Sequence, residues 1–269
     1  MCAAPSVIKK ISTGYVLGVT SVDDELFVLL RCTDNQVAVY SINDYKLLRH
    51  LNLTKFKPHM YGDMTSCVRH KCLYMSCSND ILTRRYGLAS NATSKWSVPG
   101  KPYSLSVTPS CNLLVTCREP NKLVELSADS GQSVREIALQ SDIMNPVHSM
   151  QLTTGQIVVS HGGVLTGLQR VCVVGDDGKV ICSYGGQRGS NIGKLYCPCH
   201  LAVDTNSQFI FVADSSNNRV VLLSSMLEFV RYISEGLSRP DQLYFHQATR
   251  RLFVGRHVWS EGDVTVIQL

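Results

Sequence analysis

Two histidines stand in the same local setting and offer metal-ligating chemistry. His148 and His200 each come two residues after a proline, at the start of an apolar run that is expected to form a strand. If neighbouring repeats present these strands side by side, the two imidazoles lie close together. A metal site needs three or four ligands, but the matching positions of two other repeats hold Ser104 and Gln242, with no ring of Glu, Asn or Asp. A metal-dependent lyase or hydrolase that uses the two histidines is kept as an alternative.

Other catalytic and cofactor-binding patterns do not emerge from the sequence. The Gly-Gly pairs that begin at Gly162 and Gly185 lack the strand-to-helix context of a phosphate-binding loop, so they predict turns. Cys197 and Cys199 are separated by one residue rather than two, and no second cysteine pair with zinc-site spacing accompanies them. We therefore predict no catalytic residues and no cofactor, and we expect a protein that is not an enzyme.

A repeated unit of short strands must position these residues. Its clearest copy, residues 198–234, holds four short β-branched and aromatic runs, each closed by Asp, Asn, Ser or Gly. No run is long enough for an amphipathic helix, so four antiparallel strands are predicted. The apolar core of the second strand recurs about every 40 to 53 residues, near the period of propeller blades. Its six copies are residues 26–28, 73–75, 113–115, 157–159, 210–212 and 252–254.

The count of outermost strands predicts how the ring closes. Five repeats include their own fourth strand, whereas the sequence ends at Leu269 after the third strand of the sixth repeat. Residues 6–11 have the pattern of an outer strand and can supply the missing one, which removes two exposed sheet edges. We predict an all-β, six-bladed β-propeller of four-stranded antiparallel blades, one domain over residues 1–269, closed by this N-terminal strand.

One face of such a ring gathers basic and aromatic residues. Loops from second to third strands, and from each fourth strand to the next blade, lie on the same face. We call this the basic face and predict that it binds the ligand. Its residues are Arg31, Lys55, Lys57, Tyr61, Lys101, Tyr103, Arg118, Lys122, Arg188, Lys194, Tyr196, Arg239, Arg256 and Trp259.

The overall charge bears on the kind of partner. Basic groups interleaved with aromatic rings are what a phosphate backbone with stacked bases requires. The net charge is only +5 and the pI is about 8.6, which is below the level typical of a nucleic-acid-binding domain. We therefore expect a non-enzymatic recognition module that binds a protein or peptide, with RNA binding through the same face as the alternative.

One repeat resembles a known family. The run Pro198-Cys199-His200-Leu201-Ala202-Val203-Asp204, followed by Ile-Phe-Val-Ala-Asp-Ser-Ser-Asn-Asn-Arg-Val at residues 210–220, is similar to the NHL repeat of six-bladed propellers. The match covers this blade closely. The repeats at Pro102 and Pro240 match only in their first two strands, and the first two repeats barely match.

The resemblance carries expectations about residues and partners. Asp214, Asn217 and Arg219 stand at the family's Asp, Asn and Arg positions, which implies a turn-stabilising set whose arginine reaches toward the neighbouring blade. NHL propellers commonly resemble the C-terminal part of tripartite-motif proteins, where they select a protein or an RNA for a ubiquitin ligase. The chain carries no RING or B-box cysteine–histidine pattern, so ligase activity is not expected of it.

Composition predicts the compartment. No apolar run approaches the roughly 20 residues that span a bilayer, and the first residues lack the long apolar region of a secretory signal. The 11 cysteines are an odd number, and several fall inside predicted strands, which favours free thiols in a reducing compartment. We expect a soluble, cytoplasmic protein with no membrane partner.

Overall fold

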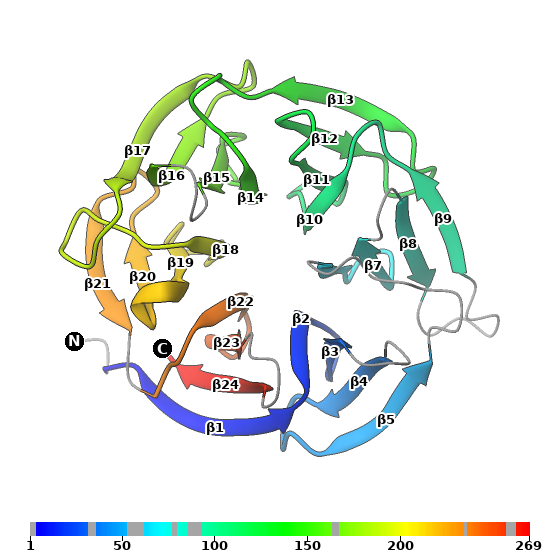
Figure 1. Ribbon diagram of the computed structural model, residues 1–269. Helices are drawn as coiled ribbons and strands as arrows, with labels where there is room; N and C mark the ends of the chain where they lie inside the picture. Colours follow the sequence, from blue (N-terminus) through cyan, green and yellow to red (C-terminus); the bar gives the residue numbers. More distant parts are fainter. Residues whose placement is uncertain are drawn as a thin grey trace.

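Six antiparallel sheets of four strands each stand around a central axis in the computed structural model (Figure 1). The structure describes residues 4–31, 36–52, 62–76, 80–85, 93–162, 167–233, 236–256 and 262–269. Each sheet is one blade, and in five of the six the strands follow one another in the chain from the axis outward. In the sixth blade, the outermost strand is the N-terminal one. The predicted six-bladed, all-β propeller is therefore confirmed.

The blades are numbered in chain order, with strands given from the innermost to the outermost. Blade 1 is β2 (Tyr15–Val22), β3 (Glu25–Arg31), β4 (Gln36–Ser41) and β5 (Leu47–Asn52); blade 2 is β6 (Met64–Cys67), β7 (Cys72–Ser76), β8 (Asp80–Arg85) and β9 (Thr93–Ser97). Blade 3 is β10 (Pro102–Val107), β11 (Leu113–Cys117), β12 (Lys122–Leu126) and β13 (Ser133–Ala138); blade 4 is β14 (Pro146–Gln151), β15 (Ile157–His161), β16 (Leu168–Val174) and β17 (Val180–Gln187). Blade 5 is β18 (Pro198–Val203), β19 (Ile210–Asp214), β20 (Arg219–Leu223) and β21 (Phe229–Ile233); blade 6 is β22 (Pro240–His246), β23 (Arg251–Arg256), β24 (Gly262–Gln268) and β1 (Ser6–Thr13).

The second strand of each blade is largely apolar because both of its faces are buried. Successive side chains of a strand point to opposite faces of the sheet, so Ile210 and Val212 of β19 pack toward blade 4, while Phe211 and Ala213 pack toward blade 6. The same division gives six apolar clusters, one between each pair of neighbouring blades. The core is therefore a ring of interfaces between blades, with the axis left for polar residues.

The N-terminal strand closes the ring as predicted. β1 lies beside β24 in an antiparallel arrangement, with Val7 opposite Ile267 and Ile11 opposite Val264 (Figure 1). Five of its eight side chains from Ser6 onward are exposed in succession, whereas Ile11 is buried in the cluster between blades 6 and 1. The strand extends to Thr13, two residues beyond the predicted end. It covers the outer edge of β24, which would otherwise present unpaired backbone groups.

Helix and covalent cross-links contribute little to the described residues. Their one helix is the three-residue 3-10 helix η1 (Ser215–Asn217), between β19 and β20. None of them forms a helix of the length and apolarity needed to cross a bilayer. Their eight cysteines are all free thiols. In this part of the chain, packing between blades and strand hydrogen bonds hold the fold.

Candidate binding site at the central pocket

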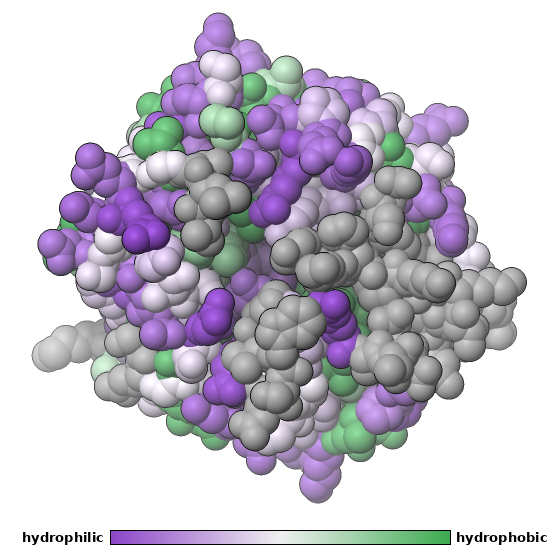
Figure 2. Space-filling model, viewed as in Figure 1, coloured by the Kyte–Doolittle hydropathy of each residue, from purple (hydrophilic) through white to green (hydrophobic). Residues whose placement is uncertain are grey.

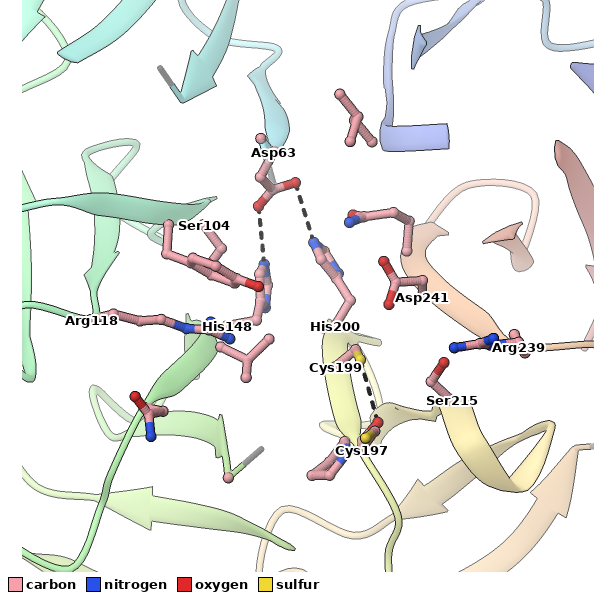
Figure 3. Close-up of a pocket in the computed structure, with 18 of the residues that line it drawn as sticks. Asp63, Ser104, Arg118, His148, Cys197, Cys199, His200, Ser215, Arg239 and Asp241 are labelled. Atoms are coloured by element: carbon pink, nitrogen blue, oxygen red, sulfur yellow. Dashed lines mark hydrogen bonds and ion pairs between the residues drawn. The ribbon is translucent and has the colours of Figure 1, made fainter. Parts of the chain in front are cut away.

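A pocket of about 590 Å³ lies where the innermost strands of all six blades begin (Figure 3). Figure 2 shows a hollow near the centre of this face of the ring. Arg118, from between β11 and β12, and Arg239, from just before β22, also line it, so it opens on the basic face. Five lining residues occupy the same place in their blades: Asp63, Ser104, His148, His200 and Gln242. The equivalent residue of blade 1 is Gly18, and its neighbour Leu17 lines the pocket.

Asp63 is the member of this ring that the sequence reasoning missed. The other polar members each follow a proline by two residues, whereas the residue two positions before Asp63 is Tyr61. Its equivalence is clear from the backbone: its N–H donates to Ser76 Oγ (2.8 Å), as that of His148 donates to the hydroxyl of Ser160 (3.2 Å). The sequence places Ser104 and Gln242 at the corresponding positions, and the structure adds this one carboxylate beside the histidines.

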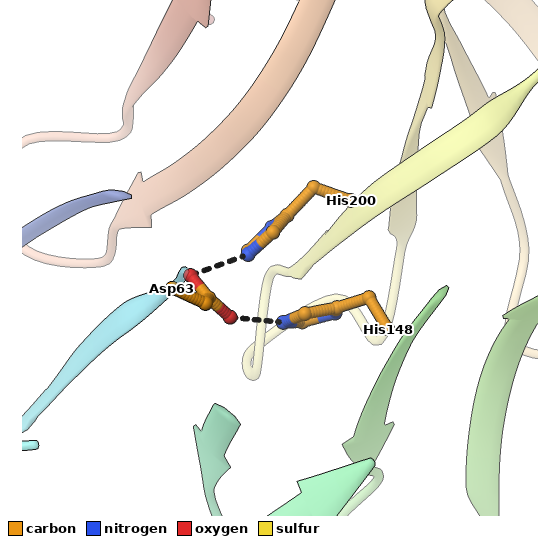
Figure 4. A group of neighbouring side chains, drawn as sticks. All are labelled: Asp63, His148 and His200. Carbon is orange, nitrogen blue, oxygen red and sulfur yellow. Dashed lines mark ion pairs between the residues drawn. The ribbon is translucent and has the colours of Figure 1, made fainter. Parts of the chain in front are cut away.

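The carboxylate of Asp63 is buried and held by two backbone groups. Its Oδ1 accepts the N–H of Met64 (2.7 Å), and its Oδ2 accepts the N–H of Leu105 in the neighbouring blade (2.9 Å). The same two oxygens face the histidines: Oδ1 lies 3.5 Å from His200 Nε2, and Oδ2 lies 3.9 Å from His148 Nε2 (Figure 4). The two backbone donors fix the orientation of the carboxylate.

The structure brings the two histidines of the sequence analysis together. Their rings stack with centroids 3.6 Å apart and an interplanar angle of 33°. Burial, and then the neighbouring His200, lower the pKa of His148 well below its ordinary value of 6.5, so this imidazole is uncharged at neutral pH. Asp63, His148 and His200 come from blades 2, 4 and 5, and their potential ligand atoms all lie within 4.8 Å of one another. The cluster has the composition of a metal site.

Two cysteines, Cys197 and Cys199, also line the pocket, and Cys199 is not activated as a nucleophile. Cys199 donates its thiol to the backbone carbonyl of Cys197 (3.3 Å). Burial, and then the carboxylate of Asp241, raise the pKa of the Cys199 thiol well above its ordinary value of 9.0. The thiolate is the reactive form, so Cys199 is unreactive at neutral pH.

The basic face is less uniformly positive than the sequence predicts. Tyr103, Arg118 and Arg239 line the pocket. Lys101, Lys122 and Arg256 instead pair with Glu119, Glu136 and Asp263, at 2.5, 2.6 and 3.6 Å. Arg31 lies over the ring of Tyr15, and Arg188 lies over the ring of Tyr196. The backbone carbonyl of Lys194 accepts a hydrogen bond from Arg219. Lys55, Lys57, Tyr61 and Trp259 lie outside the described residues.

The three residues at NHL positions form one network beside η1. Oδ2 of the buried Asp214 accepts hydrogen bonds from Asn217 Nδ2 (2.8 Å) and Arg219 Nε (2.7 Å). Arg219 also donates to the carbonyls of Ser190 and Lys194, in the segment that joins blade 4 to blade 5. Burial raises the pKa of Asp214, although these hydrogen bonds and the charge of Arg219 oppose it. The network positions the loop before β18, and with it the approach to His200.

Comparisons with known proteins find similar folds among solved structures. No protein-family model matches the chain, and no curated protein matches it significantly. Solved structures do. Hydrazine synthase of Kuenenia stuttgartiensis has a TM-score of 0.69 and 15% identity over 94% of this chain and 83% of that one. Virginiamycin B lyase of Staphylococcus aureus has a TM-score of 0.64 and 12% identity over 99% of this chain and 100% of that one. The Cps50 (Swd1) β-propeller domain of Myceliophteria thermophila has a TM-score of 0.62 and 10% identity over 99% of this chain and 100% of that one.

The likeness is one of fold. At 10–15% identity it extends to the propeller and not to what the pocket does. Two of these proteins are enzymes and the third is a propeller domain, so the expectation of a non-enzymatic protein stays untested. Membership of the NHL family also stays a prediction, since it rests on the one closely matching repeat.

Proposed function

We propose that this protein is a non-enzymatic recognition module that binds an acidic segment of a partner protein at the mouth of the central pocket. The observation that carries the proposal is a pair of guanidinium groups, Arg118 and Arg239, which line one pocket from different blades. Planar guanidinium groups bind carboxylates through two parallel hydrogen bonds. A rigid ring of blades suits this role because it holds both groups at a fixed spacing.

Arg118 is pre-positioned for such a contact. Its guanidinium carbon lies 3.5 Å from the centre of the Tyr103 ring, and its Nε donates to the carbonyl of Pro146 (3.2 Å). Stacking and this single hydrogen bond restrain the side chain, and within the described residues no carboxylate pairs with it. Ordering an arginine on binding costs side-chain entropy, and that cost is reduced here before the partner arrives.

Arg239 stands on the other side of the pocket (Figure 3). Its backbone N–H donates to Asn218 Oδ1 (2.9 Å), which fixes the loop before β22 to the end of η1. Among the described residues, its side chain has no ion-pair partner either. Two carboxylates also line the pocket: Asp63 is buried, and Asp241 lies against the Cys199 thiol.

A protein partner is favoured over RNA by the charges around the pocket. Lys101, Lys122 and Arg256 are paired with carboxylates, so the positive charge is interrupted along the face. A nucleic-acid backbone is held by a run of cations that together neutralise several phosphates. Two separated guanidinium groups fit a short acidic segment better than a phosphate chain.

The test compares two labelled ten-residue peptides, one alternating Glu with Gly and one alternating Gln with Gly, by fluorescence anisotropy with the whole chain. Tighter binding of the glutamate peptide is expected. R118A and R239A should each weaken it about tenfold, because a charge-assisted hydrogen bond contributes about 1.5 kcal/mol or more. K46A is the matched control, since Lys46 is 80% exposed and lies between β4 and β5, on the opposite face.

Two results would contradict the proposal. One is equal binding of the two peptides, or binding that both arginine variants leave unchanged. The other is tighter binding of a single-stranded 20-nucleotide RNA, with an affinity that falls steeply as salt rises. The second result would assign the basic face to RNA.

A further inference from the structure

We propose that Asp63, His148 and His200 bind a divalent transition-metal ion, with zinc as its probe, at the base of the central pocket (Figure 4). This inference goes beyond the recognition function and does not depend on it. One carboxylate and two imidazoles are a ligand set that zinc and its neighbours in the first transition row accept. Three protein ligands leave coordination positions open toward the pocket, as in zinc sites that hold water or substrate.

The position of the hydrogen on the His200 ring is the strongest argument for a metal ion. Its Nδ1 lies 2.9 Å from the carbonyl oxygen of Leu201, and a carbonyl can only accept, so Nδ1 carries the hydrogen. With its hydrogen on Nδ1, the ring presents the lone pair of Nε2 3.5 Å from Asp63 Oδ1, and this nitrogen is buried with no hydrogen-bond partner. Two acceptors face each other across this gap. A cation between them turns the repulsion into two bonds, and the Leu201 carbonyl fixes the ring as second-shell carbonyls do in metal sites.

His148 can join the same ion at little cost. Its Nε2 lies 3.3 Å from the carbonyl of Leu105, beyond the usual range of an N–H···O bond, and its Nδ1 is buried without a partner. When the ion binds, the ring hydrogen moves from Nε2 to Nδ1 and only this long hydrogen bond is lost. The lone pair on Nε2 then points toward the ion and Asp63.

Charge and spacing both favour an ion in this place. Asp63 is 2% exposed, and among the described residues no lysine or arginine pairs with it. A buried carboxylate without a charged partner is costly. Ligands about 2.1 Å from a tetrahedral zinc lie roughly 3.4 Å from one another, which is close to the 3.5 and 3.9 Å that separate the Asp63 oxygens from the two Nε2 atoms. The cluster can close on an ion with small movements.

The backbone makes this arrangement rigid. Both Asp63 oxygens already accept N–H groups, from Met64 and from Leu105 of the neighbouring blade, so each offers its remaining lone pair in a fixed direction. His148 is tied through its own N–H to Ser160 Oγ. A pre-formed site of this kind selects a small cation and resists its loss.

The experiment measures metal directly in the whole chain. Protein stripped with a chelator and reloaded at pH 7.5 should retain one equivalent of zinc after dialysis. H200A and H148Q should each weaken zinc binding at least tenfold, whereas H50Q, which alters an exposed histidine of β5, should bind as the wild type does. Circular dichroism of each variant confirms that the propeller is folded. Cobalt substitution should give ligand-field bands without a thiolate charge-transfer band, because no cysteine is among the ligands.

Three outcomes would overturn the assignment. The first is wild-type protein that holds no zinc at pH 7.5, which would leave a shared proton rather than a metal between Asp63 and the imidazoles. The second is zinc that folded H200A and H148Q retain as tightly as the wild type. The third is a thiolate charge-transfer band in the cobalt protein, which would assign the metal to Cys197 and Cys199.

Discussion

His161 shows how burial inside a blade changes the pKa of an ionisable side chain. It ends β15 with 1% of its surface exposed, and its Nε2 accepts a hydrogen bond from Arg170 Nε (3.2 Å). Burial, and then the charge of Arg170, lower its pKa from 6.5 to about 4. The side chain is therefore neutral throughout the physiological range, and its protonation opposes the fold.

The sign of the resulting pH dependence follows from this shift. Between pH 6.5 and 4 the unfolded chain binds a proton at His161 that the folded protein does not, so stability falls as the pH falls through this window. From pH 7 to pH 5 the loss that His161 contributes is about 2 kcal/mol. The free energy of unfolding by urea should therefore decline about 2 kcal/mol less over this range in H161Q than in the wild type. Equal declines would contradict the shift, and the exposed H50Q serves as the control.

Single residues of the pocket were only partly predictable. His148 and His200 could be paired from sequence because each follows a proline in a similar run, and the structure stacks them. Asp63 escaped because no proline marks its blade, although the spacing from Tyr61 was available. The pairing of Lys101 with Glu119 could not be read from the sequence, since it depends on how two loops fold back.

β1 is the element on which the ring depends, and its two isoleucines separate burial from pairing. Ile11 is buried between blades 6 and 1, whereas Ile8 is 44% exposed at a bulge in the register with β24. Both are in the same strand and have the same propensity for it.

Truncating these isoleucines should have unequal effects. I11A is expected to lower the free energy of unfolding by about 2 to 4 kcal/mol, because it removes a buried side chain and leaves a cavity. I8A should change it by less than about 0.5 kcal/mol, as surface substitutions do. Denaturant titration of the two variants measures the difference. Equal and small effects would show that β1 adds little to the closed ring.

Strands were the most predictable elements of the chain. Each second strand carries a β-branched or aromatic core bounded by turn residues, which fixes its type and its approximate length. The bounds were less predictable: β1 ends two residues beyond the predicted position, because a strand ends where its partner stops offering hydrogen bonds. That information lies in the neighbouring strand and not in the local sequence.

At the scale of the whole molecule, neighbouring blades approach so closely that some positions admit no side chain. A Cβ on Gly18 of β2 would lie 2.7 Å from the backbone nitrogen of Met64 in the next blade. A Cβ on Gly14, four residues earlier, would have no neighbouring atom within 4 Å. The pair offers a test of how rigidly the blades are packed.

G18A should destabilise the protein by about 1 to 3 kcal/mol, because overpacking a tight interface forces backbone shifts. G14A should be close to neutral. Thermal unfolding of both variants provides the measurement. A G18A variant as stable as the wild type would show that blades 1 and 2 separate without cost.

The number of blades and their closure followed from the sequence because repetition is a global signal. Six copies of one apolar core and a missing outer strand allow few arrangements other than a closed ring. The electrostatics of the pocket did not follow, because the pocket is assembled from residues of all six blades that lie far apart in the sequence.

The pairing of β1 with β24 also sets the order of events during synthesis. The ribosome makes β1 first, but its partner emerges only some 250 residues later, so the first strand must wait with an open edge while five blades take shape. Until then the nascent propeller is an open ring with two unpaired sheet edges, to which a chaperone can bind. The strand translated earliest is thus among the last to find its place.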